Sequence, residues 1–301
     1  MRRICFSETF PCKEEMMNIL KKSIESAWKA DFCNDDIELW LNNFKGEFYH
    51  MDDERRLALW LLCNFTYYNI NEIKYLCTLL FKKFVHRILI DDGATDSKEL
   101  INLIRKCQFT CIGDASESGA MLLYYFRQET NLGIKKFFFP TALTLSDDAN
   151  IVCIDDMMLS GNTAKCFYEE QLKNKPFKNI YYLALVASEE AIELLESCGI
   201  KVICCVVLDE RCKVFSDKSL CFYKYPELKT VTKEIVEGYG KKIYSKHPLG
   251  YNDGEYVLGL YYNVPNNTLP IFWSKNNWHP LIPRKEKKQD GKYTKKFGLF
   301  I

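Results

Sequence analysis

Uninterrupted apolar runs mark the middle of the chain. The clearest is Ile151–Ile154, and two others lie within residues 179–187 and 200–208. Such runs are typical of strands that are buried on both faces of a parallel sheet. Segments of helical length, 164–174 and 188–198, separate them. Because strands that alternate with helices of this length are joined by right-handed crossovers, we expect an α/β fold: a twisted parallel sheet with helices on both faces.

Two shorter strands are predicted before this run. Phe109–Ile112 precedes a loop of small residues, and Lys136–Phe139 is closed by Pro140. Upstream of Phe109 the apolar period is helical instead. Helix starts are predicted there at Pro11 and at the candidate capping residues Asp35 or Asp36, Asp52, Asn71 and Asp96.

The C-terminal part is less regular. Residues 226–243 predict a helix that starts at a proline, and residues 256–262 predict a strand. The remainder is rich in tryptophan and proline, which indicates a tail held by packing. We therefore divide the chain into a helical N-terminal region (1–107), an α/β core (108–225) and a C-terminal helix, strand and irregular tail packed on the core (226–301).

Composition limits the function more than the fold. The 301 residues suffice for one large or two ordinary domains, and a net charge of +1 gives no general attraction to nucleic acid or membrane. Fourteen cysteines occur without any CxxC pair, and several lie in apolar runs. Buried, reduced thiols explain this best and indicate a cytoplasmic protein. We find no secretory signal and no membrane-spanning run.

Candidate chemistry gathers where the Ile151–Ile154 strand ends. Asp155 and Asp156 follow directly, and the turn Ser-Gly-Asn-Thr at 160–163 then opens a helix. The first amides of a helix have no intrahelical partner and lie at the positive end of its dipole, so they bind phosphate. Paired carboxylates beside such a turn suit a sugar phosphate. The alternative is a buried strand and an ordinary capped helix, with Asp156 facing solvent.

This order of residues resembles the 5-phosphoribosyl-1-pyrophosphate (PRPP) motif of the phosphoribosyltransferases (PRTases). The resemblance implies that Asp155 and Asp156 hold the ribose 2′- and 3′-hydroxyls. It implies that the 5′-phosphate is bound by a loop of four residues, Ser160, Gly161, Asn162 and Thr163. The match covers about thirteen positions in register, which is far more specific than a lone glycine pattern.

The loop after Phe109–Ile112 is a second candidate, and in the PRTase resemblance it meets the pyrophosphate. It comprises Gly113, Asp114, Ala115, Ser116, Glu117 and Ser118. A small-residue loop before a helix suits an anion, but its two acids would repel a bare pyrophosphate unless Mg²⁺ lies between. The resemblance thus implies Mg²⁺ as cofactor, carried by the ligand, with Asp155 and Asp156 as candidate protein ligands. A plain strand–helix connection is the alternative.

Three further residues are candidates on weaker grounds. In the family, a mobile loop close to the position of Lys136 closes over the sugar, often with a basic residue, but the segment after Lys136 has no Lys or Arg. Asp209 follows the last strand of the sheet. Because the carboxyl ends of parallel strands share one edge, we expect it beside Gly113 and Asp155. Arg284 either reaches an anion in the site or anchors the tail.

The tail carries a second resemblance. The C-terminal signature of PRTase-like proteins in prokaryotic conflict systems is similar to two segments here, Asn263-x-Pro265-Asn266-Asn267-Thr268-Leu269-Pro270 and Trp278-x-Pro280-Leu281-x-Pro283-Arg284. Those proteins occur beside antiphage modules, including retrons that pair a reverse transcriptase with such an effector. The resemblance implies antiviral defence and a protein partner from the same operon, such as a reverse transcriptase with its DNA or RNA, and no membrane.

Three functions remain open from the sequence. The first is an enzyme, a glycosyltransferase that binds PRPP or a related ribose-phosphate nucleotide with Mg²⁺ and acts at ribose C1′, with Asp155 and Asp156 as catalytic residues. The second is a module that senses such a nucleotide or binds a partner without turnover, which the acidic first loop favours. The third, salvage of a nucleobase, requires neither the helical region nor the tail.

Overall fold

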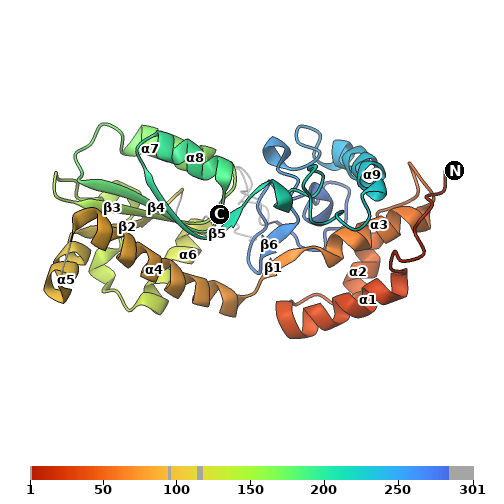
Figure 1. The fold of residues 1–301 in the computed structure, drawn as a ribbon, viewed down its shortest axis with the longest axis horizontal. Coiled ribbons are helices and arrows are strands. Elements are labelled where there is room, and N and C mark those ends of the chain that lie inside the picture. Colours follow the sequence, from red (N-terminus) through yellow and green to blue (C-terminus); the bar gives the residue numbers. More distant parts are fainter. Residues whose placement is uncertain (1, 94–95, 114–117, 285–301) are drawn as a thin grey trace, which may run out of the picture.

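The computed structural model describes residues 2–93, 96–113 and 118–284. They form two lobes that lie side by side along the longest axis (Figure 1). The α/β lobe (residues 70–208) contains a four-stranded sheet and its helices. The helical lobe (residues 2–68 and 209–284) combines the first helices with the C-terminal part of the chain.

The sheet of the α/β lobe is entirely parallel. Its strands follow the order β2 (Cys107–Cys111), β3 (Asn150–Met158), β4 (Asn179–Ser188) and β5 (Lys201–Leu208). In register, Ile154 of β3 lies between Cys111 and Leu183. The apolar runs of β3 and β4 are buried, as expected for strands between two helical layers.

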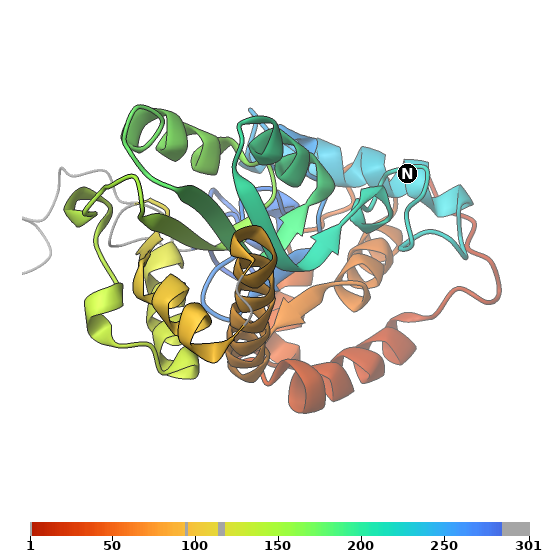
Figure 2. The same ribbon diagram turned by 60° about the vertical axis from the view of Figure 1, so that its left-hand side comes forward.

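Helices cover both faces of this sheet (Figure 2). Those on one face are α4 (Ile70–Asp92), α5 (Ser97–Arg105) and α6 (Ser118–Thr130), and those on the other are α7 (Asn162–Gln171) and α8 (Glu189–Ser197). Alternation along β3 serves both layers: Val152 and Ile154 pack toward α4 and α6, whereas Ile151 and Cys153 pack toward α7 and α8. The predicted fold class is therefore confirmed.

The chain reverses its direction across the sheet between β2 and β3. After β2, α6 leads to a 3₁₀ turn at Ile134–Lys136 (η2) and then to Phe137, which forms one parallel bridge with Phe109 on the outer side of β2. The chain crosses back to β3, and α7 and α8 carry it onward to β4 and β5. Ligands of open α/β sheets bind at such a reversal point, beyond the carboxyl ends of the strands.

The prediction of a strand at 136–139 is wrong. Lys136 ends one 3₁₀ turn and Pro140 opens another (Pro140–Ala142, η3), so only Phe137 remains in an extended, paired position. Pro140 has no amide hydrogen and cannot extend a ladder. The edge of the sheet beside β2 is therefore a single bridge.

The helical lobe is built around one large hydrophobic cluster. Its helices are α1 (Lys13–Lys22), continued by a π-helical turn at Ser23–Trp28 (η1), α2 (Asn34–Leu41), α3 (Met51–Cys63) and α9 (Glu227–Ile243). Short 3₁₀ turns lie at Glu210–Cys212 (η4), Tyr251–Asp253 (η5) and Pro270–Phe272 (η6). No described helix is long and apolar enough to cross a membrane.

A small parallel sheet joins distant parts of the chain within this lobe. β1 (Thr66–Tyr68) pairs with β6 (Leu258–Leu260), which is a shorter strand than the one predicted at 256–262. The tail is fixed by packing, as its composition predicted: the indoles of Trp40 and Trp278 both donate to the Ile271 carbonyl, each at 2.7 Å.

Helix starts agree with the predicted caps only in part. Asp96 and Ser188 cap α5 and α8 as predicted. α4 begins after Asn69, whose side-chain oxygen accepts the Asn71 amide at 2.8 Å, so the cap predicted at Asn71 lies too late. The other displaced caps are those predicted at Asp35 or Asp36 and at Asp52, where Cys33 and His50 precede α2 and α3.

By packing, α4 belongs to the α/β lobe. Ile73, Leu80 and Phe84 share a hydrophobic cluster with Ile154 of β3. The same cluster also contains Leu258 and Tyr262 from the C-terminal part of the chain, and the domain boundary placed at residue 107 stays a prediction.

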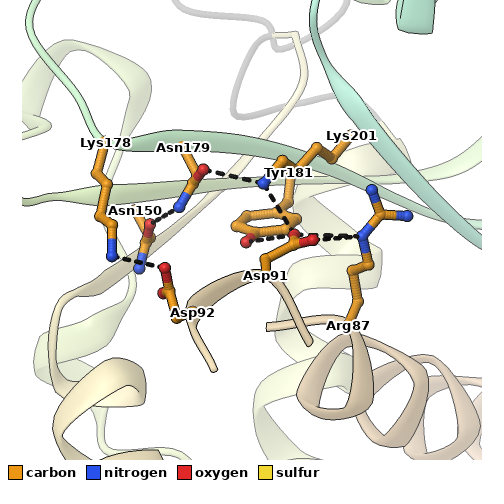
Figure 3. Close-up of polar contacts among 8 residues, drawn as sticks. All are labelled: Arg87, Asp91, Asp92, Asn150, Lys178, Asn179, Tyr181 and Lys201. Atoms are coloured by element: carbon orange, nitrogen blue, oxygen red, sulfur yellow. Dashed lines mark hydrogen bonds and ion pairs between the residues drawn. The ribbon is translucent and has the colours of Figure 1, made fainter. Parts of the chain in front are cut away.

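A polar network ties the end of α4 to the amino-terminal edge of the sheet (Figure 3). Asp91 accepts hydrogen bonds from Arg87 at 3.0 Å, Tyr181 at 3.0 Å and Lys201 at 2.9 Å. The remaining contacts join Asp92 to Lys178, Lys201 to Asn179, and Asn179 to Asn150. The network lies at the edge opposite to the carboxyl ends of the strands.

Candidate active site

β3 carries two carboxylates to the carboxyl edge of the sheet. Because successive side chains of a strand alternate, Asp155 and Asp156 leave it on opposite faces. Asp155 Oδ1 accepts the amide of Asp156 at 2.8 Å, and Asp156 Oδ1 accepts the amide of Met157 at 2.8 Å. Asp156 is only 5% exposed, so the alternative in which it faces solvent is wrong.

The turn after β3 presents the start of α7. Gly161 precedes the helix with φ at +70°, a left-handed conformation that favours glycine. Within the described chain no side chain forms a true cap, and the contact from the Asn162 amide to the Ser160 hydroxyl is long, at 3.5 Å. The first-turn amides, including that of Thr163, therefore remain available to an anion.

The carboxylates and this helix start line one pocket of about 370 Å³. One wall is the continuous segment 155–164, with Ile112 and Ser118 beside it. The opposite wall comes from the helical lobe and consists of Tyr251, Leu260, Asn263, Pro265, Asn266, Asn267 and Arg284. Residues from the two sequence resemblances thus meet at one cavity between the lobes.

Arg284 lines this pocket and also packs on the tail. Its guanidinium carbon lies 5.7 Å from the centroid of the Trp273 ring, a cation–π arrangement. The two roles considered from the sequence are therefore compatible in one side chain.

Asp156 has an unusual interior environment. Its Oδ2 atom and the hydroxyl of Tyr262 are both buried and, in the described part of the chain, neither has a hydrogen-bond partner of normal geometry. Burial raises the pKa of the Asp156 carboxyl, and the polar groups of Ser118, Met157, Asp155 and Tyr262 offset this only in part. A buried acceptor without a partner requires an explanation, and a ligand hydroxyl would supply one.

The first loop reaches the pocket at Ser118, and its other described end, Gly113, directly follows the lining residue Ile112. Gly113 has φ at +84°, and Ser118 begins α6 at the pocket wall. A Cβ on Gly119 would lie 2.8 Å from the Ile112 carbonyl oxygen and 3.5 Å from Asp155 Oδ1, so α6 starts in close contact with the site. The other predicted residues of this loop, Asp114, Ala115, Ser116 and Glu117, lie outside the described residues.

Two weaker candidates lie away from the pocket. Lys136 donates to the Arg105 carbonyl, just before β2, and therefore stands at the opposite edge of the sheet. Asp209 follows β5 at the carboxyl edge, but it is bound by Arg211 at 2.6 Å and lines a separate pocket near α8. Gly113 follows β2, the strand next to the one that carries Asp155, whereas β4 separates Asp155 from Asp209.

Two carboxylates at the pocket, those of Asp155 and Asp156, are candidate ligands of a metal ion. Among the described residues there is no group of three or more His, Cys, Asp and Glu side chains placed to hold a metal ion. Two adjacent carboxylates fit Mg²⁺ that arrives with a ligand, because Mg²⁺ keeps several waters and is usually held by one or two carboxylates together with substrate phosphates.

A sequence profile of the family described as PRTase-CE matches residues 37–284, which includes both walls of the pocket. The chain belongs to the PRTase-CE family. A search of curated protein sequences gives no match.

Solved structures similar to this PRTase-CE chain include several PRTases. Orotate phosphoribosyltransferase from Aeropyrum pernix is 17% identical with a TM-score of 0.27, over 35% of this chain and 61% of that one, less than two thirds of its length. Xanthine-guanine-hypoxanthine phosphoribosyltransferase from Helicobacter pylori is 15% identical with a TM-score of 0.29, over 48% of this chain and 84% of that one. UMP synthase from Leishmania donovani is 12% identical with a TM-score of 0.33, over 68% of this chain and 41% of that one.

Apart from Arg284, the second wall of the pocket was not predicted from the sequence. Asn263–Asn267 were identified as a family signature but were assigned no place in the site, and Tyr251, Leu260 and Tyr262 were not singled out. The signal available was the signature itself, whose asparagines are polar groups in a tail otherwise rich in tryptophan and proline.

Proposed function

We propose that this PRTase-CE protein binds PRPP or a related ribose-phosphate nucleotide, together with Mg²⁺, and acts on it at ribose C1′ as a phosphoribosyltransferase-like enzyme. The observation that carries the proposal is the meeting of two carboxylates from β3 with the uncapped start of α7 in one pocket. Carboxylates suit the ribose hydroxyls, and the helix amides suit the 5′-phosphate.

Each part of the pocket has a role in this proposal. The turn at 160–163 fixes the phosphate, and Asp155 and Asp156 hold the ribose and stabilise positive charge that develops near C1′ in an oxocarbenium-like step. Ser118 and Gly113 flank the leaving group. Mg²⁺, when bound, neutralises the diphosphate beside the two carboxylates. The catalytic effect rests on positioning and electrostatics, with the helical lobe keeping bulk water from the sugar.

The tail supports a role as an effector in prokaryotic antiviral defence. The segment that is similar to the conflict-system signature lines the same pocket through Asn263, Asn266, Asn267 and Arg284. In such a system the protein would act with a partner from the same operon, for example the reverse transcriptase of a retron with its DNA or RNA. A reverse transcriptase encoded beside this protein and recovered with it on purification would support this role, and recovery without any operon partner would oppose it.

A second function, sensing without turnover, is favoured by one observation. The first loop carries Asp114 and Glu117, whose charge opposes that of a pyrophosphate leaving group. PRPP binding that depends on Mg²⁺, without pyrophosphate release on any acceptor tested, would favour this function over the enzyme. Nucleobase salvage is the weakest alternative, because it requires neither the helical lobe nor the tail.

Isothermal titration of PRPP with Mg²⁺ into the protein tests the site. We expect binding to the natural protein and at least about a tenfold loss in Asp155→Asn/Asp156→Asn, since hydrogen bonds to charged groups contribute roughly 1.5–3 kcal/mol each. Asp148→Asn is the matched control. Asp148 is exposed, precedes the first residue of β3 at the edge of the sheet opposite to the pocket, and its Oδ2 atom lies 3.4 Å from Lys106 Nζ. Unchanged binding in the double variant would remove the assignment.

Turnover is tested separately by metabolite mass spectrometry of cells that express the protein. Depletion of PRPP or a nucleotide, absent in the double variant, is the result expected for an enzyme.

A further inference from the structure

Tyr262 belongs to the helical lobe, but its side chain is buried in the interior of the α/β lobe. It lies just after β6, is 6% exposed, and packs in the same hydrophobic cluster as Ile154 and Leu159. Its neighbours in sequence, Leu260 and Asn263, line the pocket. Tyr262 therefore reaches the sheet face on which Asp156 lies.

The phenol and the carboxylate face each other there. Burial raises the pKa of Tyr262, and the charge of Asp156 is the next contributor. Yet Asp156 Oδ2 and the Tyr262 hydroxyl both lack a hydrogen bond of normal geometry in the described chain. An unmade hydrogen bond between buried groups costs free energy. Here a donor, the Tyr262 hydroxyl, and an acceptor, Asp156 Oδ2, lie near each other without a hydrogen bond of normal geometry. Because Asp156 lines the pocket, this arrangement indicates that the hydrogen bond forms when a ligand occupies the pocket.

We infer that Tyr262 is a positioning residue for Asp156, whose carboxylate it orients to accept a hydrogen bond from a ribose hydroxyl. The inference rests on the proposed function and deepens it, because it gives the helical lobe a direct part in recognising the sugar. Donation from the phenol fixes one lone pair of the carboxylate and leaves another for the ligand. The ligand class is a phosphorylated sugar with free ring hydroxyls, as distinct from phosphate alone.

Two ligands separate sugar recognition from phosphate binding. Ribose 5-phosphate engages both the carboxylates and the start of α7, whereas inorganic phosphate engages the start of α7 alone. In Tyr262→Phe we expect the Kd of ribose 5-phosphate to rise about three- to tenfold, the loss typical of one hydrogen bond, and the Kd of inorganic phosphate to stay within about twofold. Phenylalanine fills the same space, so the urea midpoint should not change.

The adjacent residue supplies a matched control. The hydroxyl of Tyr261 bonds to that of Tyr125, away from the pocket, so Tyr261→Phe removes the same atom one position earlier. We expect it to leave both dissociation constants unchanged.

Equal weakening of both ligands in Tyr262→Phe, or no change for either, would overturn the inference. If Asp156→Asn weakens ribose 5-phosphate while Tyr262→Phe does not, this inference fails and the proposed function stands. If ribose 5-phosphate does not bind the natural protein, both fail.

Discussion

Gly161 shows how one residue fixes the geometry of the site. Its φ of +70° is strained for any residue with a side chain, and a Cβ there would lie 3.2 Å from both Ala191 Cα and Leu194 Cδ2 of α8. The turn that presents the first amides of α7 therefore lies directly against the neighbouring helix. The glycine serves the backbone path and the close packing together.

Replacement of Gly161 by alanine should weaken both stability and phosphate binding. We expect a loss of about 1–2 kcal/mol in the free energy of unfolding, from the left-handed conformation and the contact with α8. Urea denaturation and phosphate titration measure the two effects. Gly133→Ala is the control, since Gly133 has a negative φ and a Cβ there would have nothing within 4 Å. Equal stability of the two variants would contradict this account.

At this scale the sequence reveals the groups of the site but not their environment. The positions of Asp155 and Asp156 at a strand end, and of Gly161 before a helix, follow from local pattern. The burial of Asp156 does not, because Tyr262 reaches it from a distant segment. Asp209 ends a strand as predicted, but its local bond to Arg211 and the intervening β4 keep it from the pocket.

Among the elements, α4 depends on the polar network at its end (Figure 3). Burial opposes the charge of Asp91, but the hydrogen bonds from Lys201 and Tyr181 outweigh it, so the pKa of Asp91 is lowered. A carboxyl whose pKa is lower in the folded than in the unfolded chain stabilises the fold fully above the unfolded pKa, near about 4. This stabilisation is lost as the pH falls through the folded value.

Asp91→Asn should therefore destabilise the protein in a manner that depends on pH. We expect a loss of about 1–3 kcal/mol at neutral pH, as for hydrogen bonds to a charged group. The difference from the natural protein should shrink as the pH falls below about 4, where the natural carboxyl also becomes neutral. Urea unfolding across this range measures it, with Asp147→Asn, an exposed loop residue, as control. A loss that does not vary with pH would exclude the charge of Asp91 as its cause.

Elements with strong local signals could be predicted, and elements made by long-range contacts could not. The runs at β3, β4 and β5 are long enough to identify themselves. β1 has three residues and is a strand only because it pairs with β6, and the same pairing limits the strand predicted at 256–262 to the three residues of β6. The prediction of a strand at 136–139 is wrong for the opposite reason. Its apolar residues give a local strand signal, but Pro140 opens a 3₁₀ turn and has no amide hydrogen for a strand ladder.

At the scale of the whole molecule, the pocket lies between the two lobes and is lined by residues of both. A bound ligand should therefore stabilise the two lobes together. A sugar phosphate that contacts both walls should slow hydrogen exchange at the start of α7 and also in residues 263–267 of the helical lobe. Inorganic phosphate should protect the start of α7 alone. Hydrogen-exchange mass spectrometry with each ligand tests this, and protection confined to one lobe by the sugar phosphate would refute a shared site.

The pairing of β1 with β6 also sets an order of events during synthesis. The strands and helices of the α/β lobe lie within residues 70–208, but its hydrophobic cluster also contains Leu258, Leu260 and Tyr262 and is complete only after these residues have left the ribosome. The helices α1–α3 are made earlier, yet α9, the residues Val257 and Val264 that flank β6, and the tryptophan-rich tail supply much of their hydrophobic cluster. The apolar faces of α1–α3 therefore lack many of their native contacts, and remain open to chaperones, until residues 227–282 have been synthesised.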